Sequence, residues 1–124
     1  MQVDLQIDHS HRVVTLTVTG ELSDDGLMSL GDLIEKNPAI TPDFSMLVDL
    51  RGSSGKSITA AGVRAMAARR LVLPAESRRA IVVPSTLGYG MARMYELLRG
   101  DGAGAPRVFM DLEQAHRWIR TGAS

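Results

Sequence analysis

The chain has 124 residues, of which 44% are hydrophobic and 23% charged, as expected for a soluble globular protein with one hydrophobic core. Its 14 basic residues balance its 14 acidic residues, so no net charge draws it to nucleic acid or to an anionic membrane. It has no cysteine, which excludes disulfides, thiol nucleophiles and thiolate metal sites. The N-terminus is acidic and alternates polar with apolar residues, unlike a signal or transit peptide, and no apolar run is long enough for a membrane span. We expect a single domain over residues 1–124, cytoplasmic and without a membrane span.

The first two expected elements are strands that form an antiparallel hairpin. Residues 3–7 and residues 14–19 both alternate apolar and polar side chains, the pattern of a strand with one buried face. Residues 9–12 supply the short polar turn between them. The polar face of the second strand carries Thr15, Thr17 and Thr19. An uncovered face beside an edge strand favours pairing with another chain, so we predict a homodimer that uses this face or edge.

Strands and helices alternate along the rest of the chain. The expected elements are a helix that Ser23 or Asp24 caps and that ends before Pro38, a strand at 46–50, a helix from about Thr59 to near Pro74, a strand at 80–83, a helix from Thr86 to about Leu98, a strand at 107–110 and a helix capped by Asp111. The order ββαβαβαβα implies right-handed crossovers. We therefore expect an α/β fold with a mixed, mostly parallel five-stranded sheet and helices mainly on one face.

A polar segment rich in glycine and serine follows the third expected strand. It reads Gly52-Ser53-Ser54-Gly55-Lys56-Ser57 and imitates a phosphate-binding loop. Such a loop needs four residues between its glycines to wrap backbone N–H groups around phosphates, and only two intervene here. We interpret the segment as a mobile surface loop rather than a nucleotide site.

Several short motifs resemble those of one family. They are the Gly20-Glu21-Leu22 step after the second strand, the Leu47-Val48-Asp49-Leu50 strand and the Thr59-Ala60-Ala61-Gly62 helix start. With the order of elements, they resemble a STAS-type domain, the fold of bacterial anti-sigma-factor antagonists. The resemblance covers nearly the whole chain.

The resemblance also implies what this chain lacks. In phosphorylatable members of the family the helix opens with Asp-Ser-Ser-Gly or close to it, and the serine before the glycine accepts the phosphoryl group. Aligned on Gly62, this chain has Thr59 in the place of the aspartate and alanine in the places of both serines. Ala61 takes the phosphoacceptor position and accepts no phosphoryl group. Without a phosphoacceptor, the chain resembles the divergent STAS-like or SEC14-like (lipid-transfer) bacterial branch of the superfamily. Nearby hydroxyls that offer an alternative are Ser53, Ser54 and Ser57.

The carboxyl edge of the sheet is the expected place for a small-molecule site. Five polar side chains are expected to converge there: Asp49, Arg51, Ser85, Tyr89 and Arg93. Tyr89 and Arg93 are four residues apart and share a helix face. In the alternative interpretation Tyr89 is half-buried, and Arg93 pairs with Glu96 or with Asp49.

Other charged and titratable groups have plain explanations beside functional ones. The three histidines lack the spacing of a metal site, so we expect no metal and no cofactor. Two arginine pairs, Arg69-Arg70 and Arg78-Arg79, are able to bind a phosphate or an acidic partner. A solvated helix end explains the first pair equally well.

Two classes of function remain open. The first is a non-catalytic interaction or regulatory domain that binds a protein partner or itself, favoured by the missing phosphoacceptor and the neutral charge. The second is a binding protein for a small apolar or anionic, lipid-like ligand at the carboxyl edge, favoured by the Tyr89 and Arg93 pair and by seven adaptable methionines. An enzyme ranks third.

Overall fold

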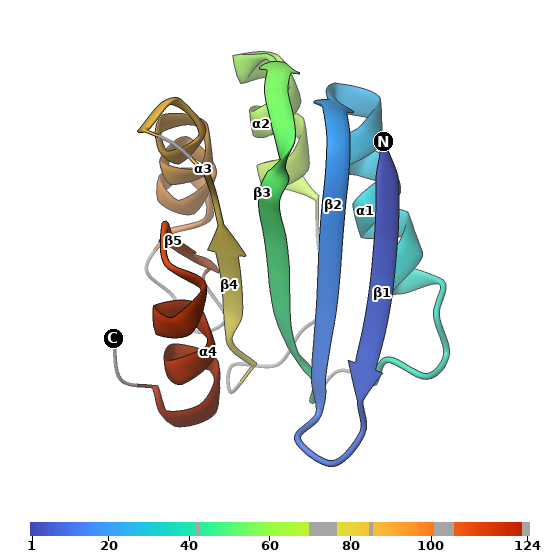
Figure 1. Cartoon of the computed structure of the whole chain (residues 1–124). Helices are drawn as coiled ribbons and strands as arrows, with labels where there is room; N and C mark the ends of the chain where they lie inside the picture. Colours follow the sequence, from blue (N-terminus) through green and yellow to red (C-terminus); the bar gives the residue numbers. More distant parts are fainter. Residues whose placement is uncertain (42, 70–76, 85, 101–105, 123–124) are drawn as a thin grey trace.

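The structure is a computed structural model that describes residues 1–41, 43–69, 77–84, 86–100 and 106–122, with the side chains of 86–89 excepted. Its elements are β1 (Gln2–Asp8), β2 (Val13–Ser23), α1 (Asp24–Glu35), β3 (Ser45–Ser57), α2 (Ala60–Ala68), β4 (Arg79–Val82), α3 (Thr86–Arg99), β5 (Pro106–Phe109) and α4 (Leu112–Thr121). The five strands lie side by side in chain order (Figure 1). β1 is antiparallel to β2, and the other neighbours are parallel. The expected mixed, mostly parallel sheet is confirmed.

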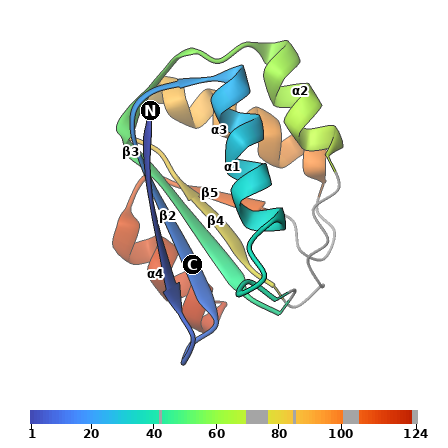
Figure 2. The same ribbon diagram turned by 90° about the vertical axis from the view of Figure 1, so that its right-hand side faces the viewer.

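The helices divide unequally between the two faces of the sheet. Figure 2 shows α1, α2 and α3 on one face and α4 on the other. α4 packs against β3, β4 and β5, so it leaves most of the same face of β1 and β2 uncovered, although Val13 of β2 contacts the core under α4. The prediction of helices mainly on one face is thus confirmed, with α4 as the exception.

Alternation along the strands decides which side chains each face buries. Val14, Leu16 and Val18 of β2 are buried toward α1, whereas the threonines between them are half-buried or exposed. On the opposite face, Leu47 and Ala80 lie under α4 and contact its buried Ala115 and Ile119. The sheet therefore carries one core on each side, because residues at positions i and i+2 of a strand share a face.

Three helix starts are closed by side-chain caps, of which the sequence predicted those at Ser23 and Asp111. Ser23 Oγ accepts from Gly26 N at 3.1 Å, and Thr59 Oγ1 accepts from Gly62 N at 3.0 Å. Asp111 Oδ1 accepts from Gln114 N at 3.1 Å. Each cap satisfies one N–H that the helix itself leaves without a partner.

The third strand is longer than the sequence indicates. β3 continues through Ser57, so the expected loop at 52–57 is wrong. The extension runs beside the end of β2, where Gly20 pairs with Ser53 and Ser23 with Ser57. Glycine and serine are poor strand formers, so local propensity favours a loop here. Backbone pairing with the equally extended β2 overrides that preference.

Candidate functional site

Helix α2 stands away from the sheet. It packs chiefly on α1 and α3 rather than on a strand, and Figure 2 shows it farther from the sheet than either neighbour. The space beneath it is a cavity of about 400 Å³ between the sheet and the three helices. Protein interiors rarely leave voids larger than a water molecule, and ligand sites are roughly 300–1,000 Å³. The cavity is therefore the best candidate for a binding site.

Most of the described cavity wall is apolar. Its sheet side and helix sides include Leu16, Val48, Ile81, Leu27, Leu30, Val63, Met66, Met91 and Ala92. Polar groups are few and lie at opposite ends of the strands. Ser53, Ser54 and Lys56 line the cavity from the late part of β3, and Arg79 lines it from the start of β4. This arrangement suits a molecule that is mainly apolar and has a polar or charged end.

Arg79 is a charged group in a mostly apolar wall. The residue is only 6% exposed and shares the cavity wall with Tyr95 of α3. Burial lowers the pKa of Arg79, the neighbouring Tyr95 raises it, and the positive charge of Arg99 lowers it, with a net decrease. An arginine stays protonated in proteins all the same, so this end of the cavity holds positive charge.

The N-terminal end of α2 is fastened to α1. Thr59 donates from its backbone N to Asp24 Oδ1 at 2.9 Å and from its hydroxyl to Asp24 Oδ2 at 2.6 Å. Both hydrogen bonds lower the pKa of Asp24. Gly62 lies directly against this carboxylate. Asp24, the first residue of α1, and Thr59, the residue before α2, thus hold the N-terminal end of α2, the helix that covers the cavity.

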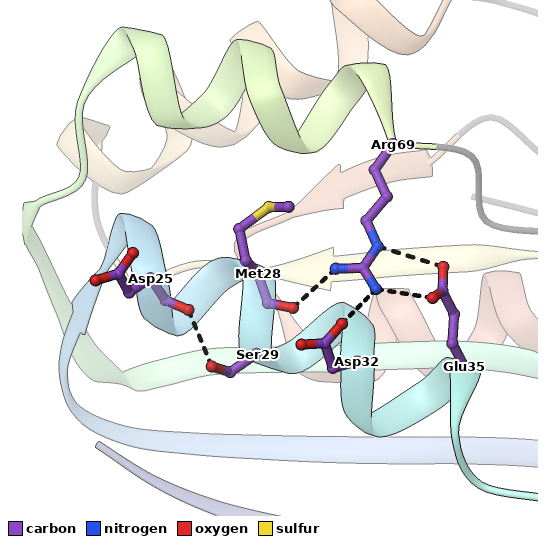
Figure 3. Close-up of polar contacts among 6 residues, drawn as sticks. All are labelled: Asp25, Met28, Ser29, Asp32, Glu35 and Arg69. Atoms are coloured by element: carbon purple, nitrogen blue, oxygen red, sulfur yellow. Dashed lines mark hydrogen bonds and ion pairs between the residues drawn. The ribbon is translucent and has the colours of Figure 1, made fainter.

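The C-terminal end of α2 is fastened by Arg69 (Figure 3). Its guanidinium donates to Asp32 Oδ1 at 2.6 Å, to Glu35 Oε2 at 2.8 Å and to the backbone oxygen of Met28 at 2.9 Å, all on α1. From the other side, Arg99 of α3 donates to the backbone oxygens of Ala67 and Arg69. Arg69 is therefore neither solvated nor directed at an external anion, because its guanidinium is ion-paired with acidic residues of α1. Arg70 lies outside the described residues.

The Arg69 cluster predicts a dependence of stability on pH. Hydrogen bonds from Arg69 lower the pKa values of Asp32 and Glu35 in the folded protein. The unfolded chain therefore binds more protons in the acid range, and stability falls as pH drops through the folded pKa values, whereas the contribution is complete above the unfolded values. We expect an Arg69→Met protein to lose less stability on acidification than the native protein. Urea midpoints measured from neutral to acid pH check this, and parallel profiles contradict it.

The five residues expected at the carboxyl edge do not form one site in the described structure. Asp49 pairs with Arg51, whose Nε and Nη2 each donate to the carboxylate at 3.0 Å. Burial raises the pKa of Asp49, but the hydrogen bonds from Arg51 outweigh it and lower the pKa overall. Asp49 is level with Thr17 and Val82 in the sheet, on the face that α4 covers.

Arg93 belongs to α3, on the other face of the sheet, and forms an ion pair with Glu96. This is the partner that the alternative interpretation names. Ser85 and the side chain of Tyr89 lie outside the described residues. None of Asp49, Arg51 and Arg93 is part of the cavity wall in the described chain. A binding role for the five residues stays a prediction.

The position of the family phosphoacceptor is the exposed Ala61, in the first turn of α2. Thr59 carries the only hydroxyl from 59 to 66, and that hydroxyl donates to Asp24. We therefore expect an anti-sigma-type kinase with ATP to add no phosphate in this segment. Intact-mass analysis with peptide mapping checks the result, and one phosphate within 59–66 contradicts it. Ala61→Ser tests whether the helix start presents a hydroxyl to such a kinase.

Comparisons with known proteins identify the fold. No family model and no curated protein matches the sequence. The chain is similar to the structure of an uncharacterized protein of the DUF3478 family with a SpoIIAA-like fold, from Shewanella loihica PV-4. The TM-score is 0.59 at 15% identity, over 95% of this chain and 92% of that chain. At an identity this low the similarity shows the fold alone. The structural similarity confirms the STAS-like fold that the motifs predicted.

Two features are absent from the described residues. No helix there combines the length and the apolar character needed to cross a bilayer. No group of three or more histidine, aspartate or glutamate side chains in that part of the chain is placed to hold a metal ion.

Sequence reasoning missed the cavity because each of its apolar wall residues has the pattern of an ordinary core position. Leu30, Val63 and Ala92 occupy the inward faces of three different helices. Periodicity shows that such a face is covered, but it does not show how far away the covering element lies. A sequence signal was present only in Arg79, a charged residue at the start of a buried strand.

Proposed function

We propose that this protein is a non-catalytic binding protein that holds a small amphipathic molecule in the cavity beneath α2. The observation that carries the proposal is the cavity of about 400 Å³. At the roughly 30 Å³ that one water occupies in the liquid, such a space accepts about a dozen non-hydrogen atoms. The proposal keeps the ligand class expected from the sequence and moves the site from the carboxyl edge to the interior.

The charge of Arg79 favours a ligand with an anionic end. A guanidinium has five N–H donors in a planar fork, which serve a protein partner and a carboxylate at once. In an apolar wall the attraction between opposite charges is much stronger than in water. A fatty-acid-like molecule with its carboxylate toward Arg79 and its chain along the apolar wall fits both features.

A fluorescent apolar probe tests the cavity. We expect 1-aminonaphthalene, a solvent-sensitive fluorophore small enough for a space of about a dozen non-hydrogen atoms, to bind the native protein with a change in fluorescence, and decanoate to displace it. Ala92 is 9% exposed and lines the cavity, so Ala92→Phe fills part of the space and is expected to weaken probe binding at least tenfold. The matched control is Ala65→Phe, at an exposed position of α2. Equal probe binding by the two variants, or none by the native protein, refutes the proposal.

Decanoate and decanol compare ligands with and without charge. We expect the native protein to prefer decanoate and Arg79→Met to lose that preference while it still binds decanol. The exposed Arg64 provides the control variant Arg64→Met. Equal binding of both ligands by the native protein leaves the cavity as a site and removes the anionic end from the proposal.

An interaction domain that binds a protein partner or a second copy is the second candidate function. It is favoured by the edge strand β1, which pairs with β2 on one side and has no strand of the described sheet on the other. A cavity ligand and a partner at this edge are compatible, because β1 does not contribute to the described cavity wall.

A further inference from the structure

The two edges of the sheet differ in how they are protected. At the β5 edge, the backbone oxygen of Phe109 accepts a hydrogen bond from Val83 N, so the backbone of Phe109 faces the β4 side. Because backbone direction alternates along a strand, the N–H and C=O positions of Pro106 and Val108 face outward. Pro106 has no N–H, and Val108 N donates to Glu96 Oε2 at 2.7 Å. Both outward N–H positions of this short strand are therefore closed to another strand.

The β1 edge has none of these protections. β1 is seven residues long and contains no proline. Among the described residues, no side chain forms a hydrogen bond with its backbone. Val3, Leu5 and Ile7 are half-buried on the face toward α1, and the residues between them are exposed. A long strand with open N–H and C=O groups and a half-exposed apolar row is suited to pair with another strand.

We infer that β1 pairs with β1 of a second copy of this chain, antiparallel, about a two-fold axis through Leu5, so that one sheet continues across the dimer. This register pairs all seven residues of the strand with each other. On the apolar face, Leu5 lies opposite Leu5 of the second copy and Val3 opposite Ile7. Each pair covers apolar surface that one copy leaves partly exposed.

Charge selects this register over its neighbours. With the axis at Leu5, Asp4 lies opposite Gln6 and Asp8 opposite Gln2, so each carboxylate faces an amide that donates hydrogen bonds. An axis at Asp4 places Asp4 opposite Asp4 of the second copy, and an axis at Gln6 places Asp4 opposite Asp8. Like charges directly opposite destabilise a strand pair. Of these three registers, only the one with full overlap has no opposed carboxylates.

Single cysteines test the register, because the native chain has none. In the inferred dimer the two copies of position 5 are directly opposite, with Cβ atoms roughly 4.5–5.5 Å apart. We expect Leu5→Cys to form an intermolecular disulfide under mild oxidation. The two copies of position 3 are offset by four residues, about 13 Å, so Val3→Cys serves as the control and is expected not to cross-link. Equal cross-linking of both variants overturns the register.

Charge variants test the edge itself without a thiol. Gln6→Asp places a carboxylate opposite Asp4 at two symmetric positions, and we expect it to raise the dimer dissociation constant about three- to tenfold. Gln6→Lys places an amine there and is expected to keep or strengthen the dimer. Light scattering across concentrations measures both variants, with circular dichroism as the check of folding. A native monomer at high micromolar concentration overturns the inference. So does a dimer that Thr17→Arg disrupts and Gln6→Asp does not, because it uses the open sheet face instead.

Discussion

Replacing Leu47 by alanine is expected to lower the free energy of unfolding by about 2–5 kcal/mol. Leu47 is fully buried, level with Thr15 and Ala80 in the sheet, and it belongs to the core that α4 covers. The substitution removes apolar burial and leaves a space that the rigid sheet does not close. Urea unfolding followed by circular dichroism measures the loss.

Leu97→Ala is the matched control for this prediction. Leu97 lies in α3 and is 62% exposed, so the same substitution is expected to change stability by roughly 0.5 kcal/mol or less. A loss below about 1 kcal/mol for Leu47→Ala contradicts the packing of α4 against this face of the sheet.

Gly62→Ala is expected to destabilise the protein by about 1–3 kcal/mol, although alanine is the better helix former. A Cβ at Gly62 overlaps the carboxylate of Asp24, which receives two hydrogen bonds from Thr59. The carboxylate has to move, and both bonds that hold the N-terminal end of α2 are then lost. Thermal unfolding of the variant measures the effect.

Two further variants distinguish the effect of the steric overlap at Gly62 from the effect of alanine's higher helix propensity. Gly90 lies in α3 with nothing within 4 Å of an added Cβ, so Gly90→Ala is expected to stabilise by up to about 1 kcal/mol. The double variant Asp24→Ala/Gly62→Ala removes the overlapping carboxylate and is expected to be more stable than Gly62→Ala alone. A double variant that is less stable than the single one contradicts the contact between these residues.

The features predicted correctly from the sequence depend on interactions within a few residues. The caps at Ser23 and Asp111 each join a side chain to an N–H three residues later. The order of strands and helices follows from hydrophobic period, and the parallel sheet follows from their alternation. The identity of the fold also followed, because the short motifs lie at the strand ends and helix starts that define it.

The site was predicted less well because its parts are distant in the sequence. The carboxyl-edge hypothesis assumed that Asp49 and Arg93 face each other, but nothing local states on which face of the sheet a helix packs. In the structure Asp49 pairs two residues away and Arg93 three residues away. Such short-range partners were visible in the sequence, and they compete successfully with longer contacts because they order fewer residues.

The sequence by itself therefore determined the chain order ββαβαβαβα, the caps at Ser23 and Asp111 and the amphipathic strand at one edge of the sheet. Only the tertiary structure decided that α4 crosses to the other face, that β3 extends to Ser57, and that α2 is held away from the sheet by Asp24 and Arg69. Those contacts join residues 34 to 41 positions apart. The cavity exists because they fix both ends of α2 on its helical neighbours, so that no strand has to contact it.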